Sequence, residues 1–182
     1  MLTLIIGGAR SGKTRFAQSL CSTAGRVTYV ATARGDDEEM RARIDRHRQD
    51  RPSHWKTIEE PLALGAAVGR VVPCSDVVLV DCLTVWLANL MWERRERSAA
   101  EVETGAVSEV EELVRLAADG TIVLVSNEVG GGIVPDHPTG RLFRDLQGFV
   151  NQRAAAAADR VFLTVAGIPI CIKPDRENSK TC

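Results

Sequence analysis

Residues 7–14 read Gly-Gly-Ala-Arg-Ser-Gly-Lys-Thr and follow directly after an apolar run at residues 2–6. This octet fits the pattern G-x-x-x-x-G-K-[ST], in which the backbone N–H groups of a glycine-rich loop surround phosphate oxygens. The lysine of such a loop reaches the β- and γ-phosphates and has a catalytic role, and the threonine hydroxyl can ligate Mg²⁺. We therefore predict a binding site for a nucleoside triphosphate at Gly7, Gly8, Ala9, Arg10, Ser11, Gly12, Lys13 and Thr14.

Short apolar runs alternate with segments of helical periodicity along the rest of the chain. Runs of this length are typical of strands buried on both faces of a parallel sheet. Strands alternating with helices predict an α/β fold of the P-loop NTPase (RecA-like) class, a mostly parallel sheet flanked by helices. The expected strands are residues 2–6, 27–31, 77–80, 122–125 and 161–165, with an edge strand at 168–173. The expected helices are residues 13–24, 36–49, 62–71, 83–94, 107–118 and 139–157.

The 182 residues suit one domain with one sizeable core. We expect a single P-loop nucleotide-binding domain over residues 1–173 and a polar tail at 174–182. Residues 93–104 are rich in charge, and we expect a mobile excursion or the fraying end of a helix there.

The composition restricts the partners and the compartment of the chain. A net charge of -1 gives no basic field that would recruit nucleic acid or an anionic membrane. No apolar stretch approaches the ~20 residues that span a bilayer, and the first residues lack the basic region of a secretory signal. The five cysteines stand singly, which indicates reduced thiols in a cytoplasmic protein rather than disulfides or a zinc site. They are Cys21, Cys74, Cys82, Cys171 and Cys182.

Two further apolar runs end in carboxylates at the predicted carboxyl edge of the sheet, where open α/β sheets bind their ligands. Asp81 can hold Mg²⁺ through water or accept hydrogen bonds from a nucleotide, or it can cap the helix that follows. Glu128 can position Mg²⁺ or act as a base, or it can serve in a cap or a turn. We predict a Mg²⁺ site at Thr14, completed by Asp81 or Glu128.

The predicted helix at residues 36–49 carries a histidine among arginines. Met40, Ile44 and His47 are spaced i, i+4 and i+7, so they share one face of that helix. A neutral imidazole can attack phosphorus because its lone pair is free near neutral pH. The residues alone leave two interpretations open, a nucleophile or a solvated surface histidine, and they favour the second. The surrounding arginines suit a triphosphate, and they are Arg43, Arg46, Arg48 and Arg51.

Four blocks of the sequence resemble the adenosylcobinamide kinase/adenosylcobinamide-phosphate guanylyltransferase family. The first joins the phosphate loop to Tyr-Val-Ala-Thr-Ala at 29–33. The second reads Arg-Ile-x-x-His-Arg at 43–48 and Arg-Pro-x-x-Trp-x-Thr-x-Glu at 51–59. The third reads Asn-Glu-Val-Gly-x-Gly-Ile-Val-Pro at 127–135, and the fourth is spread over 144–159. The resemblance spans residues 1–173 and is more specific than the phosphate loop, because other P-loop kinases lack the second and third blocks.

This resemblance implies two reactions. In the first, the γ-phosphate of ATP or GTP passes to the aminopropanol hydroxyl of adenosylcobinamide. In the second, a histidine attacks the α-phosphorus of GTP, expels pyrophosphate and becomes a GMP-histidine. The corrinoid phosphate then takes the GMP, which gives adenosylcobinamide-GDP. The matching histidine is His47, so the resemblance reverses the preference drawn from the residues alone.

The resemblance also implies GTP contacts outside the phosphate loop, at Ala31, Thr32, Ala33, Arg48, Gln49, Asp50, Arg51, Glu59 and Asp81. Asp81 stands where some relatives have glutamate, and its carboxylate can still pair with the guanine N1–H and 2-amino group through a shorter arm. Arg46 stands where some relatives have a second histidine, which leaves His47 as the candidate in this helix. Family members are trimers with a site shared between subunits, so a homotrimer is expected.

Two other functions stay open. A monofunctional P-loop kinase of a small metabolite would use the phosphate loop and leave His47 in a structural role. A nucleotide-gated assembly module of the RecA type would need basic loops that face DNA or an interaction tail, and the sequence shows neither. A protein-bound phosphoramidate, which is labile in acid and stable in alkali, would separate the bifunctional enzyme from the simple kinase.

Overall fold

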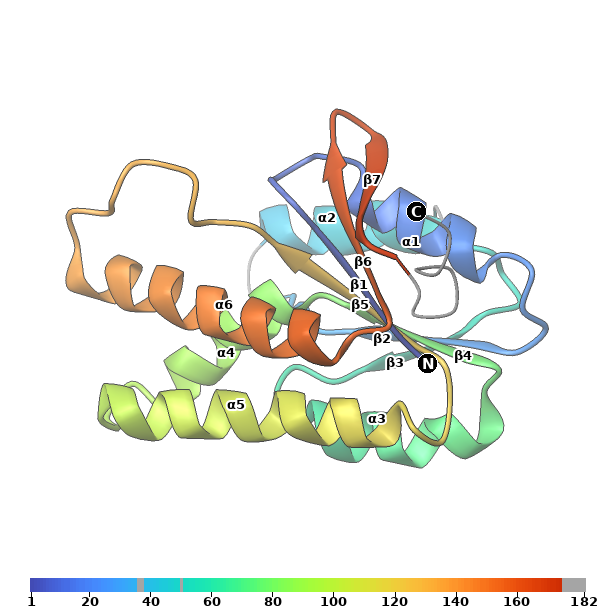
Figure 1. The fold of residues 1–182 in the computed structure, drawn as a ribbon, viewed down its shortest axis with the longest axis horizontal. Helices are drawn as coiled ribbons and strands as arrows, with labels where there is room; N and C mark the ends of the chain where they lie inside the picture. The colour runs from blue at the N-terminus through green and yellow to red at the C-terminus, as the bar shows by residue number, and fades with distance from the viewer. Residues whose placement is uncertain (36–37, 50, 175–182) are drawn as a thin grey trace.

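The computed structural model describes residues 1–35, 38–49 and 51–174, which form one seven-stranded sheet with helices on both faces (Figure 1). The order across the sheet is β3-β2-β4-β5-β1-β6-β7. Neighbouring strands are parallel except for β6 and β7, which are antiparallel. This arrangement confirms the α/β class and the mostly parallel sheet. The strands are β1 Leu2–Gly7, β2 Val27–Ala31, β3 Lys56–Glu59, β4 Val77–Asp81, β5 Ile122–Asn127, β6 Arg160–Val165 and β7 Ile168–Lys173.

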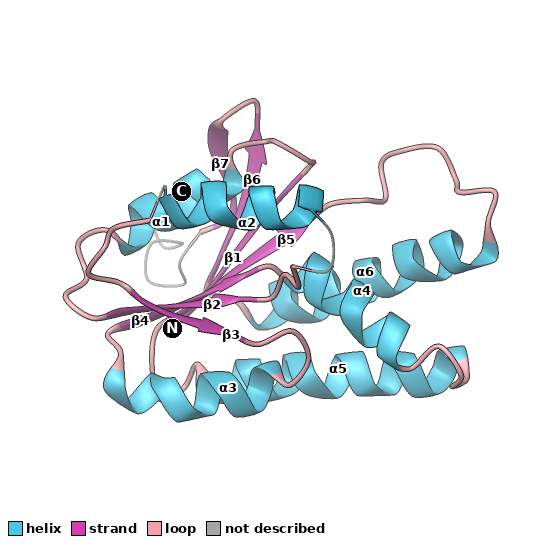
Figure 2. Cartoon of the chain, turned by 180° about the vertical axis from the view of Figure 1, so that it is seen from behind, coloured by secondary structure: helices cyan, strands magenta, loops and turns pink. Residues whose placement is uncertain are grey.

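The helices form two unequal layers. Helices α1 and α2 lie on one side of the sheet, and α3, α4, α5 and α6 lie on the other (Figures 1 and 2). Their bounds are α1 Lys13–Cys21, α2 Glu38–Gln49, α3 Leu64–Val71, α4 Leu83–Glu93, α5 Ala99–Leu116 and α6 Pro138–Ala157, with a 3-10 turn, η1, at Val72–Cys74. The expected tail at 174–182 falls, apart from Pro174, outside the described residues.

The core is divided by the sheet because successive strand residues face opposite layers. Leu4, Val80 and Leu124 belong to the larger cluster, which packs against the four-helix layer. Ile5 and Leu79 belong to the smaller cluster beside α1. Strands β1, β2, β4 and β5 are therefore buried on both faces, which explains why they read as continuous apolar runs.

Strand β3 was not predicted from the sequence. Its four residues, Lys-Thr-Ile-Glu, are mostly polar and exposed, because β3 is an edge strand with β2 as its neighbour. An edge strand of this kind lacks the apolar run that marks a buried strand, and charged residues are common on such edges.

The expectation for residues 93–104 was wrong for residues 99–104, which are the first residues of a regular helix. Helix α5 begins at Ala99, eight residues before the predicted start at 107. Ser98 accepts a hydrogen bond from the Glu101 N–H, and the Glu101 carboxylate accepts one from the Ser98 N–H. This reciprocal capping box starts the helix, and the buried Val102 and Ala106 continue its apolar stripe toward the core.

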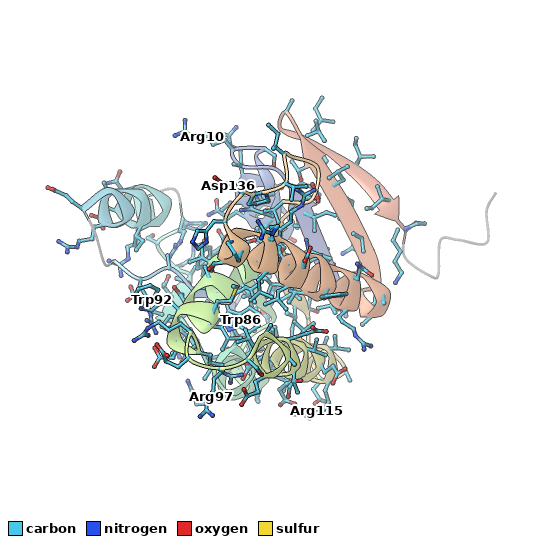
Figure 3. The ribbon with its side chains drawn as sticks, turned by 90° about the vertical axis from the view of Figure 1, so that its left-hand side faces the viewer. Arg10, Trp86, Trp92, Arg97, Arg115 and Asp136 are labelled. Carbon is cyan, nitrogen blue, oxygen red and sulfur yellow. The ribbon has the colours of Figure 1, made fainter. Side chains whose placement is uncertain are left out.

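The two tryptophans of α4 differ in their setting. Trp86 is fully buried and donates its indole N–H to the Leu62 carbonyl at 2.8 Å, whereas Trp92 is 67% exposed (Figure 3).

The four cysteines within the described residues are free thiols: Cys21, Cys74, Cys82 and Cys171. Burial raises the pKa of Cys21 to about 12, so this thiol stays protonated.

We expect Ser98→Ala to lower the free energy of unfolding by about 1 kcal/mol, because it removes an N-cap. For a chain of this size the melting temperature should fall by roughly 2–4 °C, measured by circular dichroism. Ser108→Ala, an exposed change in the same helix, is the matched control. An equal shift in both variants would argue against the capping box.

Candidate active site

The phosphate loop lies between the carboxyl end of β1 and the start of α1. Gly12 adopts φ 93° at the N-cap of α1, and Arg10 also lies in the left-handed region with φ 55°. The Phe16 N–H donates to the Gly12 carbonyl at 3.0 Å, which begins the helix directly behind the loop. The N-terminus of α1 therefore faces the loop, as anion binding at a helix end requires.

The β6–β7 turn packs against this loop and holds its shape. The Gly167 N–H donates to the Ser11 carbonyl at 2.8 Å. A side chain on Gly12 would come within 3.0 Å of the Gly167 Cα, and one on Gly7 within 2.5 Å of the Thr164 carbonyl oxygen. Two of the glycines in the motif are thus also required by packing within the chain.

Lys13 lies over the loop that it follows. Its ammonium donates to the Gly8 carbonyl at 2.9 Å, and the side chain is almost fully buried. Thr14 is the next residue of α1 and is half-buried. Gly8, Ala9 and Arg10 are exposed at the tip of the loop. The structure therefore brings the eight predicted phosphate-loop residues together at one edge of the sheet.

Asp81 ends β4 and is held by a residue that sequence reasoning did not select. The Tyr29 hydroxyl donates to one carboxylate oxygen of Asp81 at 2.5 Å, and the Arg51 guanidinium lies 3.5 Å from the Tyr29 ring centroid. Burial, and then the Asp81 charge, raises the pKa of Tyr29 well above its usual value, so the phenol remains a donor. Tyr29 opens the block at 29–33 that carries the family resemblance, but the sequence assigned it no contact with Asp81.

The alternative that Asp81 caps the following helix is wrong, because Cys82 is the N-cap of α4. Its sulfur accepts a hydrogen bond from the Val85 N–H at 3.5 Å. Burial, and then the Asp81 charge, raises the pKa of Cys82 to about 11, so the thiol is protonated at neutral pH. The carboxylate of Asp81 is consequently not used as a helix cap.

Thr32 holds the peptide on either side of Cys82 in place. Its hydroxyl donates to the Cys82 carbonyl at 2.9 Å and accepts from the Cys82 N–H at 2.8 Å. The Thr32 side chain is fully buried, and its N–H donates to the Asp81 carbonyl at 3.2 Å. Its described contacts are with the protein, so a nucleotide contact by its hydroxyl stays a prediction. The neighbouring Ala31 carbonyl accepts from the Glu60 N–H, and Ala33 is half-buried.

The remaining predicted contacts gather around the end of α2 and the end of β3. Arg48 forms an ion pair with Glu59, and both side chains are more than half exposed. Gln49 is exposed at the last residue of α2. Asp50 lies outside the described residues.

The structure places the backbone of His47 in α2. The side chains of Met40, Arg43, Arg46 and His47 lie outside the described part of the chain, so the predicted shared face is not tested.

Glu128 has the turn role that the sequence left open. Its carboxylate accepts from the Gly130 N–H at 2.6 Å and from the Gly131 N–H at 3.2 Å. A Mg²⁺ site at Thr14, completed by Asp81 or Glu128, stays a prediction. In the described residues, no three His, Cys, Asp or Glu side chains gather as a metal cluster.

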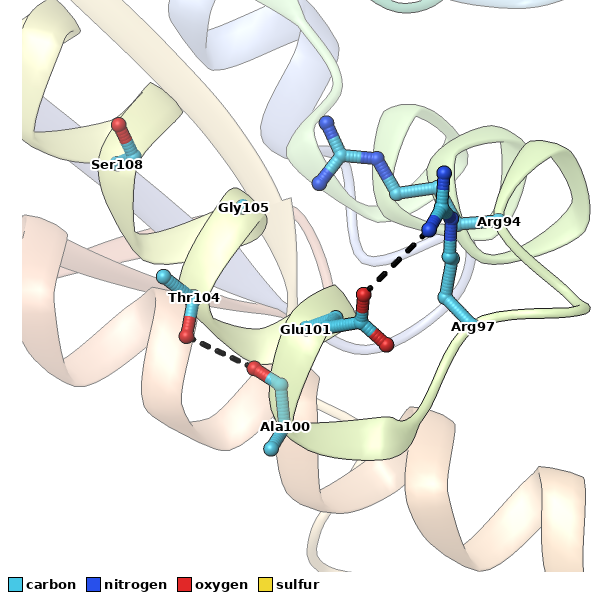
Figure 4. A pocket seen from close by; sticks show the side chains of 7 residues that line it. All are labelled: Arg94, Arg97, Ala100, Glu101, Thr104, Gly105 and Ser108. Carbon is cyan, nitrogen blue, oxygen red and sulfur yellow. Dashed lines mark hydrogen bonds and ion pairs between the residues drawn. The ribbon is translucent and has the colours of Figure 1, made fainter.

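One hollow of the described chain lies away from the phosphate loop. It has a volume of about 710 Å³ between the end of α4 and α5, and Figure 4 shows Arg94 and Arg97 reaching across it. A smaller hollow of about 210 Å³ adjoins Gly12 and Gly167 at the back of the phosphate loop. The hollow between α4 and α5 is lined by none of the predicted nucleotide contacts.

Residues 3–172 match the model of the family described as cobinamide kinase / cobinamide phosphate guanyltransferase. The chain belongs to this family. It is 40% identical over 181 residues to the bifunctional adenosylcobalamin biosynthesis protein CobU of Escherichia coli, with 95% of this chain and 100% of that protein covered. It is 45% identical over 175 residues to the corresponding protein CobP of Pseudomonas aeruginosa, with coverages of 95% and 98%.

The fold is shared with solved structures of low sequence identity. Among them is an ATPase from the type III secretion system of pathogenic bacteria, with a TM-score of 0.54 and 12% identity, covering 89% of this chain and 50% of that one. The likeness confirms the P-loop NTPase fold and carries nothing about activity. Among the described residues, no helix has both the length and the apolar character needed to cross a membrane.

We expect Thr32→Val to lower the free energy of unfolding by about 1–2 kcal/mol, because it leaves the partly buried Cys82 N–H without its acceptor. Thr28→Val is the control: the Thr28 hydroxyl is also buried, but its partner Ser75 keeps a bond to the Val71 carbonyl. Urea denaturation of both variants measures the difference. Equal losses would contradict the assigned role of Thr32.

Proposed function

We propose that this chain phosphorylates adenosylcobinamide with ATP or GTP and then transfers GMP from GTP to the product, which gives adenosylcobinamide-GDP. The observation that carries the proposal is the phosphate loop at the end of β1, in a chain that matches the kinase/guanyltransferase family over residues 3–172. The names of the relatives, bifunctional adenosylcobalamin biosynthesis proteins, agree with it. Residues 1–173 would act as one domain.

The kinase step is a transfer of the γ-phosphoryl group. The aminopropanol hydroxyl oxygen forms a bond to the γ-phosphorus, the bond to the β–γ bridging oxygen breaks, and the hydroxyl proton is released. The loop N–H groups and Lys13 would bind the β- and γ-phosphates and stabilise the charge on the leaving diphosphate. The position of Lys13 over the loop supports this role.

The guanylyl step passes through a covalent intermediate. An imidazole nitrogen of His47 forms a bond to the α-phosphorus of GTP, and the bond to the α–β bridging oxygen breaks to release pyrophosphate. A phosphate oxygen of the corrinoid then displaces the histidine from that phosphorus. Arg48 and Arg51, at the end of α2, would offset the charge of the leaving pyrophosphate.

Mg²⁺ would be held by the Thr14 hydroxyl and the Asp81 carboxylate, and it would neutralise charge on the phosphate oxygens. In the alternative role, Asp81 and Glu59 would accept hydrogen bonds from the guanine N1–H and 2-amino group. Tyr29 occupies one oxygen of Asp81 in either case and fixes the direction of the carboxylate. A homotrimer and a cytoplasmic location belong to the same proposal.

Incubation with Mg²⁺ and α-³²P-GTP should label the protein, and His47→Ala should abolish that label. The label should vanish in acid and survive alkali, because it is a phosphoramidate. His54→Ala is the matched control, since His54 is an exposed histidine seven residues away. Label on His47→Ala, or its absence from wild type that still binds nucleotide, would favour a monofunctional kinase of a small metabolite.

Lys13→Met should lower kcat of the kinase step by roughly a hundredfold or more, because it removes a charge aimed at the transferred phosphate. Labelling by α-³²P-GTP should fall with it, since one loop serves both steps. The control is Arg15→Met, which removes an exposed charge from the same helix. Circular dichroism checks that both variants fold. Similar kcat values in the two variants would contradict the role of Lys13 and of the phosphate loop in the kinase step.

A further inference from the structure

The segment between β5 and α6, residues 128–137, displays two adjacent apolar side chains to solvent. Ile133 is 96% exposed, more than any other large apolar side chain described, and Val134 is 62% exposed. We name this segment the β5–α6 loop. It stands out from the body of the chain in two opposite views (Figures 1 and 2). The two neighbouring side chains form a small apolar surface that a ligand can contact.

The conformation of the β5–α6 loop is held by polar contacts. Arg144 donates to the carbonyls of Gly130 and Gly132, and Arg141 donates to those of Pro135 and Asp136. A side chain on Gly140 would come within 2.9 Å of Pro135 Cβ, so helix α6 packs closely under the loop.

The Glu128 carboxylate closes the first turn of the loop through the Gly130 and Gly131 N–H groups. Hydrogen bonds to four carbonyls and from two N–H groups of the loop thus fix the conformation in which Ile133 and Val134 are exposed to solvent.

The loop begins beside the phosphate site. The Glu128 N–H donates to the Gly7 carbonyl at 3.0 Å, so the loop leaves the sheet at the first residue of the phosphate loop. Arg10 and Asp136 lie on the same side of the molecule, opposite α5 (Figures 1 and 3). On the other flank of β1, the β6–β7 turn already covers the phosphate loop through Gly167.

We propose that Ile133 and Val134 form the platform on which the corrin macrocycle of the acceptor lies, with its aminopropanol arm directed to the phosphate loop. This inference rests on the proposed function, which supplies a large acceptor that carries ring methyl groups and primary amides. The two aliphatic side chains suit the methyl groups, and the glycine backbone beside them can pair with the amides. A second copy of the chain is the alternative occupant of this surface, and the sedimentation measurement below separates the two.

The test is Ile133→Ser/Val134→Ser, with Ile172→Ser as control because Ile172 is 54% exposed on the distant end of β7. Dialysis of cobinamide against each protein, read by its visible absorbance, measures acceptor binding. The double variant should bind cobinamide about tenfold more weakly, from the loss of two apolar contacts. Its labelling by α-³²P-GTP, a half-reaction without acceptor, should match that of wild type, as should its sedimentation coefficient.

Unchanged cobinamide affinity in the double variant would overturn the inference while leaving the proposed function in place. A smaller sedimentation coefficient would also overturn it, by showing that a second copy of the chain covers the loop. Wild-type protein that neither binds nor phosphorylates cobinamide would overturn the proposed function, and the inference with it. The KM for cobinamide in the kinase step, which should rise with the dissociation constant, provides an independent measurement.

Discussion

The close packing at the carboxyl end of β1 is the constraint on which the rest of the site depends. Gly7 has no room for a side chain, because a Cβ there would meet the Thr164 carbonyl and the Ser11 hydroxyl. Both neighbouring strands also contribute a hydrogen bond to the loop, from the Glu128 N–H on the β5 side and from the Gly167 N–H on the β6 side. The loop therefore takes its shape from the sheet, which is the most buried part of the chain, and this preorganises the N–H groups that bind phosphate.

The strand order explains how residues far apart in the sequence reach one edge. Parallel strands bring all their carboxyl ends to the same side, so Ala31, Glu59 and Asp81 end neighbouring strands β2, β3 and β4. The phosphate loop follows β1, two positions away from β4 across β5. The edge is consequently divided: the residues proposed to contact the nucleotide base end β2, β3 and β4, and the β5–α6 loop adjoins the phosphate loop.

The features that the sequence predicted are those with a local signal. The buried strands read as apolar runs because both of their faces are covered, and the glycines of the phosphate loop match a spacing imposed by phosphate geometry. Strand β3 and the contact of Tyr29 with Asp81 carry no such signal, because each depends on which strand lies beside which. The start of α5 did have a local signal, the Ser98 and Glu101 capping box, but the surrounding charges obscured it. The hydrogen bonds from Arg141 and Arg144 to carbonyls of the β5–α6 loop depend on the packing of α6 beneath that loop, so the sequence did not predict them.

Burial separates the residues that build the site from those that can meet a ligand. Tyr29, Thr32 and Cys82 are engaged inside the protein, and together they determine where the Asp81 carboxylate lies. Arg48 and Glu59 are paired at the surface, where such an ion pair contributes only about 0–1 kcal/mol to stability. An ion pair that contributes so little free energy does not explain the fold. Because both side chains are exposed, each can exchange its partner for a phosphate or a base of a ligand. Substitutions in the buried group should therefore act on stability, whereas a loss of GTP affinity on changing Glu59 would report on ligand binding itself.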